Sequence, residues 1–216
     1  MEETPLPVVL IEDQISDWKM TEEGIIVYPK KDGCDVIVLR PHFTFLSGEP
    51  LGWEFFAITN VIPSKKMNRE ALELYRRLKR AECRLRWKGF IKKKPIFEVI
   101  GEEVEGSPEL ANLLNMNETL SRFLRIVGVN ELKVQLLHER GKEGPEEEAG
   151  QTKYTSEPVS EPKEVTWVVM AFKSYTLPIE RLNIKRCKRD FVVIVKALSE
   201  ISRIAKSFAL KKLEEL

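Results

Sequence analysis

The sequence predicts an α+β protein with a mainly antiparallel sheet and about three helices packed on one of its faces. Short β-branched and aromatic runs, separated by turn residues, fill most of residues 1–63. Three later stretches, which begin near Asn68, Pro108 and Asp190, repeat apolar residues every three or four positions, as amphipathic helices do. The elements follow one another as a loose ββα succession, which suits helices gathered over one face of an antiparallel sheet.

The composition is that of a globular protein with balanced charge. Of 216 residues, 43% are hydrophobic, which is enough for one large domain or one domain with a small appendage. The 35 lysines and arginines nearly cancel the 34 aspartates and glutamates, so the net charge predicts no polyanionic partner and any such attraction must be local. Glutamine is scarce while Glu, Lys, Arg, Ile and Val are abundant, a composition typical of heat-adapted proteins.

Residues 1–63 form the first part of the chain, which is mostly β. Val8–Ile11 lies between prolines and acidic residues, which predicts a short edge strand. Ile25–Tyr28 and Val36–Leu39 are β-branched runs joined by turn residues that end at Gly33, a pattern that predicts a hairpin.

Two features follow this hairpin. Pro41 is expected to interrupt the second strand, because proline has no amide hydrogen to donate to a neighbouring strand. Trp53–Ile62 is rich in aromatic and β-branched residues and predicts a longer strand.

Residues 64–138 are expected to form a helix, a hairpin, a second helix and a strand. Asn68 is a good N-cap, and the apolar residues from Ala71 to Ala81 share one side, so the first helix is predicted here. Beyond it the repeat shortens to two residues, because Leu85 and Trp87 alternate with basic residues. This alternation predicts a strand.

The returning strand is expected at Ile96–Ile100, antiparallel to the first. A cap residue at Ser107, followed by proline, predicts the start of the second helix, which Gly128 ends. The polar patch Asn115–Asn117 is expected to divide this helix into two pieces. Leu132–Leu137 then alternates as a strand.

The last two parts are a loop and a strand followed by a long helix. Residues 139–163 are rich in Gly, Glu, Pro, Ser and Thr and cannot bury enough surface to fold, so a flexible acidic loop is predicted. The strands that flank it favour an overlong hairpin connection within one sheet, and a domain boundary is the alternative. Residues 164–216 are expected to pack back on the same domain, with a helix from about Asp190 to Leu213 that would be roughly 35 Å long.

Motifs for catalysis and cofactor binding are missing from the sequence. It contains no GxGxxG, GxxxxGK[ST], GxSxG or HExxH, so it implies no cofactor and no metal site. The two histidines, His42 and His138, are each expected to make an ordinary structural or surface contact. A metal site built on Glu102 and Glu103 would lack any ligand spacing to fix its geometry.

The cysteines and the apolar runs indicate the cellular compartment. Cys34, Cys83 and Cys187 are far apart, which predicts neither a disulfide framework nor a CxxC site and suits a reducing cytoplasm. Each is expected to be a small buried hydrophobe, although Cys187 has basic neighbours that could lower the pKa of its thiol. Because no segment has the roughly 20 apolar residues that span a bilayer, we expect a soluble cytoplasmic protein without a membrane partner.

Positive charge is concentrated in two segments, 65–94 and 181–189. On one common surface they could neutralise several phosphates and bind nucleic acid in a salt-sensitive manner. The alternative is that they are solvated faces neutralised by nearby acids, with Trp87 in the core and not available for base stacking. The candidate nucleic-acid-binding residues are Lys65, Lys66, Arg76, Arg77, Arg80, Arg84, Arg86, Lys88, Lys185, Arg186, Lys188 and Arg189.

The leading functional hypothesis is a non-catalytic binding or assembly module, because amphipathic elements occur without a catalytic constellation. Its partner would be another protein or a second copy of the chain, with the long C-terminal helix as a candidate interface. Nucleic-acid binding through the two basic segments is the alternative. An enzyme would require the fold to gather carboxylates or a cysteine in a cleft.

Overall fold

The computed structural model describes residues 4–43, 50–62, 82–89, 93–100, 106–138 and 165–215. Several predictions lie outside these ranges. They are the helix from Asn68 to Ala81, the acidic loop 139–163, the carboxylates Glu102 and Glu103, and the basic residues Lys65, Lys66, Arg76, Arg77 and Arg80.

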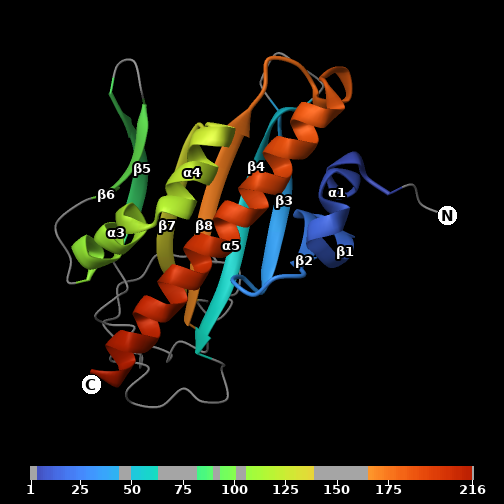
Figure 1. Cartoon of the computed structure of the whole chain (residues 1–216). Coiled ribbons are helices and arrows are strands. Elements are labelled where there is room, and N and C mark those ends of the chain that lie inside the picture. Colours follow the sequence, from blue (N-terminus) through green and yellow to red (C-terminus); the bar gives the residue numbers. More distant parts are fainter. Residues whose placement is uncertain are drawn as a thin grey trace, which may run out of the picture.

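The strands of the described residues form one antiparallel sheet of eight strands (Figure 1). The spatial order is β1-β2-β3-β4-β8-β7-β5-β6, so β4 and β8 form the centre and β1 and β6 form the edges. The strands are β1 (Ile15–Thr21), β2 (Gly24–Pro29), β3 (Val36–Phe43), β4 (Pro50–Ile62), β5 (Glu82–Lys88), β6 (Lys94–Val99), β7 (Glu131–His138) and β8 (Val165–Ser174).

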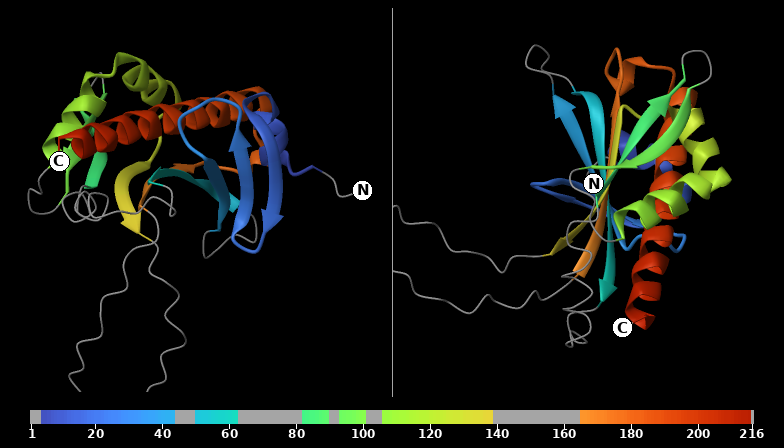
Figure 2. Two further views of the ribbon diagram at one scale, coloured as in Figure 1. Left: turned by 90° about the horizontal axis from the view of Figure 1, so that it is seen from below. Right: turned by 90° about the vertical axis from the view of Figure 1, so that its left-hand side faces the viewer.

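The helices of the described residues gather over one face of this sheet (Figure 2). They are α1 (Leu6–Ile11), α3 (Ser107–Met116), α4 (Glu118–Val127) and α5 (Ile184–Glu214), with short 3-10 turns at Glu12–Gln14 and Ile179–Arg181. This layered arrangement confirms the α+β class predicted from the sequence.

Helix α5 is the main cover of the sheet. It lies across β4 and β8 and also contacts α1, α3 and α4 (Figure 1). The ring of Phe191 packs edge-on against Phe55 and Trp53, at centroid distances of 5.1 and 6.0 Å. Each large side chain buried in this way contributes about 1.5–3 kcal/mol of burial free energy, so the α5 contact is a major source of stability.

The structure extends the predicted C-terminal helix by six residues, because α5 begins at Ile184 and not near Asp190. Asn183 provides the start signal, since its side-chain oxygen accepts from the amides of Lys185 and Arg186 at 3.0 and 3.2 Å. Apolar periodicity missed this turn because it is mostly basic. The full helix of 31 residues is about 46 Å long.

The predicted edge strand at Val8–Ile11 is wrong, because these residues belong to helix α1. Pro7 occupies the first turn of α1, where its missing amide hydrogen leaves no hydrogen bond unmade. The helix also lets Val8, Leu10 and Ile11 be buried together beside α5. Tertiary packing thus overrides the local β-like composition.

The edge strand near the N-terminus is β1. It was not predicted, because it is mostly polar and has only Ile15 fully buried. The prediction that Pro41 interrupts its strand is also wrong, because β3 continues through Pro41, which pairs with Trp53 of β4. On its other side β3 pairs with β2 only from Ile37 to Leu39. Proline is tolerated at Pro41 because no neighbouring strand requires its amide there.

The other predicted elements that fall on described residues are present. β2 pairs with β3, and β5 pairs with β6, as predicted for the two hairpins. Asn117 separates α3 from α4 and caps α4 by accepting from the Leu120 amide at 2.8 Å, and Gly128 ends α4 in a left-handed conformation. β7 and β8 are adjacent and antiparallel, so the strands on either side of the acidic segment belong to one sheet.

At both edges of the sheet, side chains form hydrogen bonds with backbone groups of the edge strand. On β6, the amide of Phe97 donates to Asn115 Oδ1 at 2.7 Å, and Asn115 Nδ2 donates to the Phe97 carbonyl at 2.9 Å. On β1, the Trp18 amide donates to the Asp17 carboxylate at 2.8 Å. These contacts use groups that would otherwise pair with an added strand.

We expect Asn115→Ala to lower the free energy of unfolding by about 1–2 kcal/mol and to increase self-association, because it frees the outward groups of Phe97. Urea unfolding and concentration-dependent light scattering measure both effects. Asn112→Ala, at an exposed position of the same helix, is the control. Identical behaviour of the two variants would contradict edge protection by Asn115.

Glu200 provides a pH-dependent contribution to stability. Its carboxylate accepts from Arg203 at 2.7 Å and from Asn117 at 2.7 Å, and the hydrogen bond from Arg203 is the main cause that lowers its pKa below the ordinary 4.5. A lowered carboxyl pKa stabilises the fold above the unfolded value, and this contribution is lost as the pH falls through the folded pKa.

We therefore expect Glu200→Gln to cost about 1–2 kcal/mol at neutral pH, with the difference from the unsubstituted protein shrinking as the pH falls below 4.5. Thermal or urea unfolding between pH 3 and 7 measures this difference. Glu214→Gln, at an exposed position on the same helix, is the control. A loss of stability at Glu200 that is independent of pH would refute the ionic origin.

Candidate functional site

The basic residues of β5 lie on the sheet face that points away from the helices. Arg84, Arg86 and Lys88 alternate with residues that are turned toward the core. Glu131 lies 3.8 Å from Arg84, and Glu98 lies 3.2 Å from Arg86 and 2.6 Å from Lys88. The hydrogen bond from Lys88 lowers the pKa of Glu98. Each of these cations thus has an acidic partner on a neighbouring strand.

The second basic group lies in the helical layer, on the first turns of α5. Lys188 is 3.7 Å from Glu12 and 3.2 Å from Asp13, and Arg189 is 3.1 Å from Asp190. Lys185 and Arg186 are exposed on the same turns. The sheet therefore separates the two described groups of candidate residues, and the structure does not bring them together on one surface.

Trp87 lies on the core side of β5, as its position in the alternation predicted. Its indole Nε1 donates to the carbonyl of Val129 at 3.2 Å, and the ring packs against the core. An indole held in this way is not available as a stacking platform beside the β5 cations.

His42 and the three cysteines make structural contacts, while the side chain of His138 lies outside what the structure describes. His42 Nδ1 is 3.5 Å from Glu54, and its ring meets Phe172 edge-on. All three cysteines are buried and unpaired. Burial raises the thiol pKa of Cys34 to about 11 and of Cys83 to about 12.

The prediction that basic neighbours could lower the thiol pKa of Cys187 is wrong. Burial raises this pKa, and the nearby carboxylate of Asp190 raises it further, which outweighs the opposing effect of Arg186. Among the described residues, no group of three His, Cys, Asp or Glu side chains is placed to hold a metal ion.

A cluster of polar side chains lies beneath the first turns of α5. Asp190 is only 2% exposed, and its charge acts on Lys173 and Tyr175, which project from the end of β8. Lys173 Nζ donates to the carbonyls of Val127 and Gly128, both at 2.9 Å, and so satisfies the C-terminus of α4. This cluster joins α4, α5 and the sheet, with Asp190 fully buried and Lys173 and Tyr175 partly buried.

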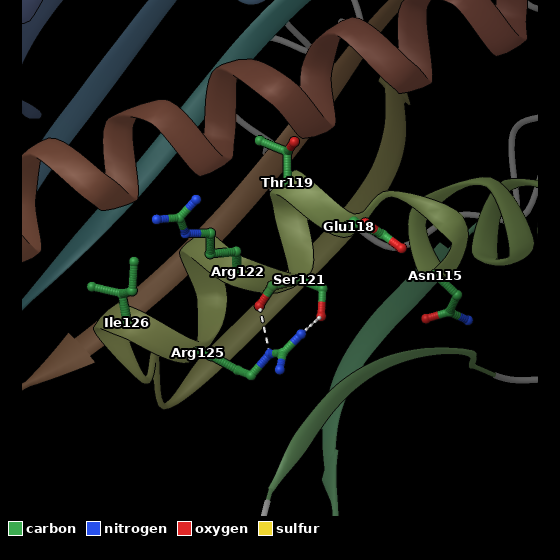
Figure 3. A pocket seen from close by; sticks show the side chains of 7 residues that line it. All are labelled: Asn115, Glu118, Thr119, Ser121, Arg122, Arg125 and Ile126. Atoms are coloured by element: carbon green, nitrogen blue, oxygen red, sulfur yellow. Dashed lines mark hydrogen bonds between the residues drawn. The ribbon is translucent and has the colours of Figure 1, made fainter.

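A broad hollow of about 890 Å³ lies over the outer surface of α4 (Figure 3). Its charged side chains do not converge: Arg125 folds back on Ser121, donating to the carbonyl and hydroxyl oxygens at 3.3 and 3.1 Å, while Arg122 extends elsewhere. Glu118 is the one carboxylate among its described lining residues. The hollow therefore presents a solvated helix surface without an acid and base in contact.

A second hollow, of about 390 Å³, is an apolar groove between α3 and the C-terminal half of α5. We call it the α3–α5 groove. Its α3 wall carries Met116 and Leu113, which are 79% and 40% exposed. Its α5 wall carries Ile204 and Phe208. The full set of described lining residues is Leu113, Met116, Asn117, Arg203, Ile204, Ser207, Phe208 and Lys211.

Polar contacts fix the two walls of the α3–α5 groove at both ends. At one end Asn117 Nδ2 donates to Glu200 at 2.7 Å, and Glu200 also binds Arg203. At the other end Glu109 of α3 lies 2.8 Å from Lys212 of α5. Walls held at both ends give a groove that exists before any partner arrives, which reduces the entropy that binding must overcome.

Sequence reasoning missed this groove as a site. Leu113 and Phe208 lie within the apolar repeats that predict the second and the C-terminal helix, and such repeats ordinarily mark a core. The spacing of Leu113 and Met116, and of Ile204 and Phe208, was the available signal. Spacing alone does not show that two apolar faces meet at an angle and leave a gap.

No helix of the described residues is both long and apolar enough to cross a bilayer. Comparison of the chain with protein-family models, with curated proteins and with solved structures gives no match.

We expect the three thiols to resist modification in the folded protein. At pH 8, Ellman's reagent should react slowly with the native chain and fully after unfolding in guanidinium, because burial removes access and keeps the thiols protonated. Absorbance at a fixed reagent excess measures the rate. Fast reaction of Cys187 in native protein, identified by peptide mapping against Cys187→Ala, would contradict the structure.

Proposed function

We propose that this chain is a non-catalytic protein-binding module whose partner docks in the α3–α5 groove. The observation that carries the proposal is the exposure of Met116 and Leu113 beside an apolar wall of α5. Two apolar side chains exposed side by side are disfavoured in water, and a polar rim around them favours a binding role.

Methionine is suited to this role. Its unbranched, polarisable side chain adapts to different apolar surfaces, and it is frequent at protein-binding grooves. Fully burying a side chain of this size contributes about 1.5–3 kcal/mol, so Met116 would be a principal contact.

The protected sheet edges favour a helical partner over an added strand. Asn115 occupies the outward groups of Phe97 on β6 and Asp17 occupies the amide of Trp18 on β1, so neither of these two positions is open to pairing with another chain. An amphipathic helix laid in a groove between two helices is the other common mode of segment recognition.

Nucleic-acid binding has less support as an alternative. The β5 cations and the α5 cations lie on opposite sides of the sheet, and Arg84, Arg86, Lys88, Lys188 and Arg189 each have a nearby carboxylate. The separation of the two groups leaves fewer cations for one phosphate backbone, which lowers the gain from counterion release.

Capture from a lysate of the source organism tests the proposal when it is compared between variants. Immobilised wild-type chain is expected to retain one or more proteins that Met116→Lys loses, because a charge in an apolar groove cannot be buried cheaply. Asn112→Lys, which adds the same charge to an exposed position outside the groove lining, is the control and should retain them. Circular dichroism and thermal unfolding confirm that both variants fold.

Retention of the same proteins by Met116→Lys and wild type would show that the groove is not the binding site. Capture of nucleic acid in place of protein, lost on substituting Lys185 and Arg186, would support the alternative.

A further inference from the structure

We infer that the occupant of the α3–α5 groove is an amphipathic helix of another protein, with acidic residues beside its apolar face. This inference rests on the proposed function and specifies the chemistry of the partner. It comes from the charges of the groove lining and from the symmetry that a second copy would impose.

The lining of the α3–α5 groove carries positive charge only. Arg203 and Lys211 line it, and no carboxylate is among its described lining residues. The two cations are separated by two helical turns of α5, on either side of Ser207, so they stand toward opposite ends of the groove.

Both cations remain accessible to a partner. Lys211 is 64% exposed and only reaches Glu109 and Glu215 at 3.8 and 3.9 Å, distances at which exposed pairs contribute little. Arg203 binds Glu200 through Nε and Nη2, and its side chain is 56% exposed. Its guanidinium has five N–H donors, so it can donate to a further carboxylate from the groove side.

A second copy of the chain fits this surface poorly. The simplest symmetric contact crosses two α5 helices antiparallel at Ser207, which is exposed and small enough for close approach. That arrangement places Arg203 beside Lys211 of the second copy, and Glu200 beside Glu214 of the second copy. Both juxtapositions join like charges, which disfavours the dimer and favours a partner of opposite charge.

A helix with apolar residues at i, i+3, i+4 and i+7 and glutamates at the flanking positions would match both the apolar walls of the groove and its two cations. The stripe covers Met116, Leu113 and Ile204, and the glutamates reach Arg203 and Lys211. A basic version of the same helix would bury the same apolar area but meet both cations with like charge.

Two synthetic helical peptides test the inference. They share a leucine stripe at these positions and differ in flanks of glutamate or lysine, and fluorescence anisotropy measures their binding to the full chain. We expect the glutamate peptide to bind about tenfold more tightly at low salt, with the preference shrinking as salt screens the charges. Lys211→Glu should reverse or abolish the preference, whereas Lys206→Glu, outside the described lining, should leave it unchanged.

The outcomes separate the inference from the proposed function. Equal binding of both peptides, lost in Met116→Lys and unaffected by Lys211→Glu, would overturn the acidic partner while the groove remains a binding site. Absence of binding by either peptide would count against the groove itself. A concentration-dependent dimer in light scattering that Met116→Lys dissociates would show that the occupant is a second copy.

Discussion

The contact between α5 and the central strands β4 and β8 organises the described structure. An antiparallel sheet with one apolar face needs a cover, and an amphipathic helix needs an apolar surface beneath it. Phe191 of α5 packs against Phe55 and Trp53 of β4, and this contact buries apolar surface of both the helix and the sheet. Because α5 also contacts α1, α3 and α4, loss of its buried stripe would leave α1 and α4 without their main neighbour and would remove one of the contacts of α3.

The same constraint produces the candidate site. The described contacts of α5 with the sheet fall on β4 and β8, while its last turns meet α3. Those turns retain the apolar period, with Ile204 and Phe208, and α3 is the one described helix that lines the gap beside them. Met116 is left on the rim of the gap, where its exposure has no structural advantage in the isolated chain. A partner that buries it removes that cost.

Charged residues in this protein act through local ion pairs more than through the net charge of the chain. Lysine and arginine nearly balance aspartate and glutamate over the whole chain. In the structure the balance is repeated at short range, as in Lys88 with Glu98 and Lys212 with Glu109. These surface pairs each contribute little to stability, but they leave no continuous field of one sign across both basic groups. The two cations of the groove lining follow the same pattern, because Glu200 and Glu109 stand beside them just outside the described lining.

The sequence by itself determined the α+β class, both hairpins, the division at Asn117 and the strands that flank the acidic segment, because these depend on period and turn chemistry that neighbouring residues set. It could not place Val8–Ile11 in a helix or find β1, since packing beside α5 and pairing with β2 decide those elements. The groove depended on tertiary structure most of all. Leu113 and Phe208 both lie in apolar helical repeats, and only the packing of α3 against α5 decides that Phe208 is buried while Leu113 and Met116 stay exposed beside two cations.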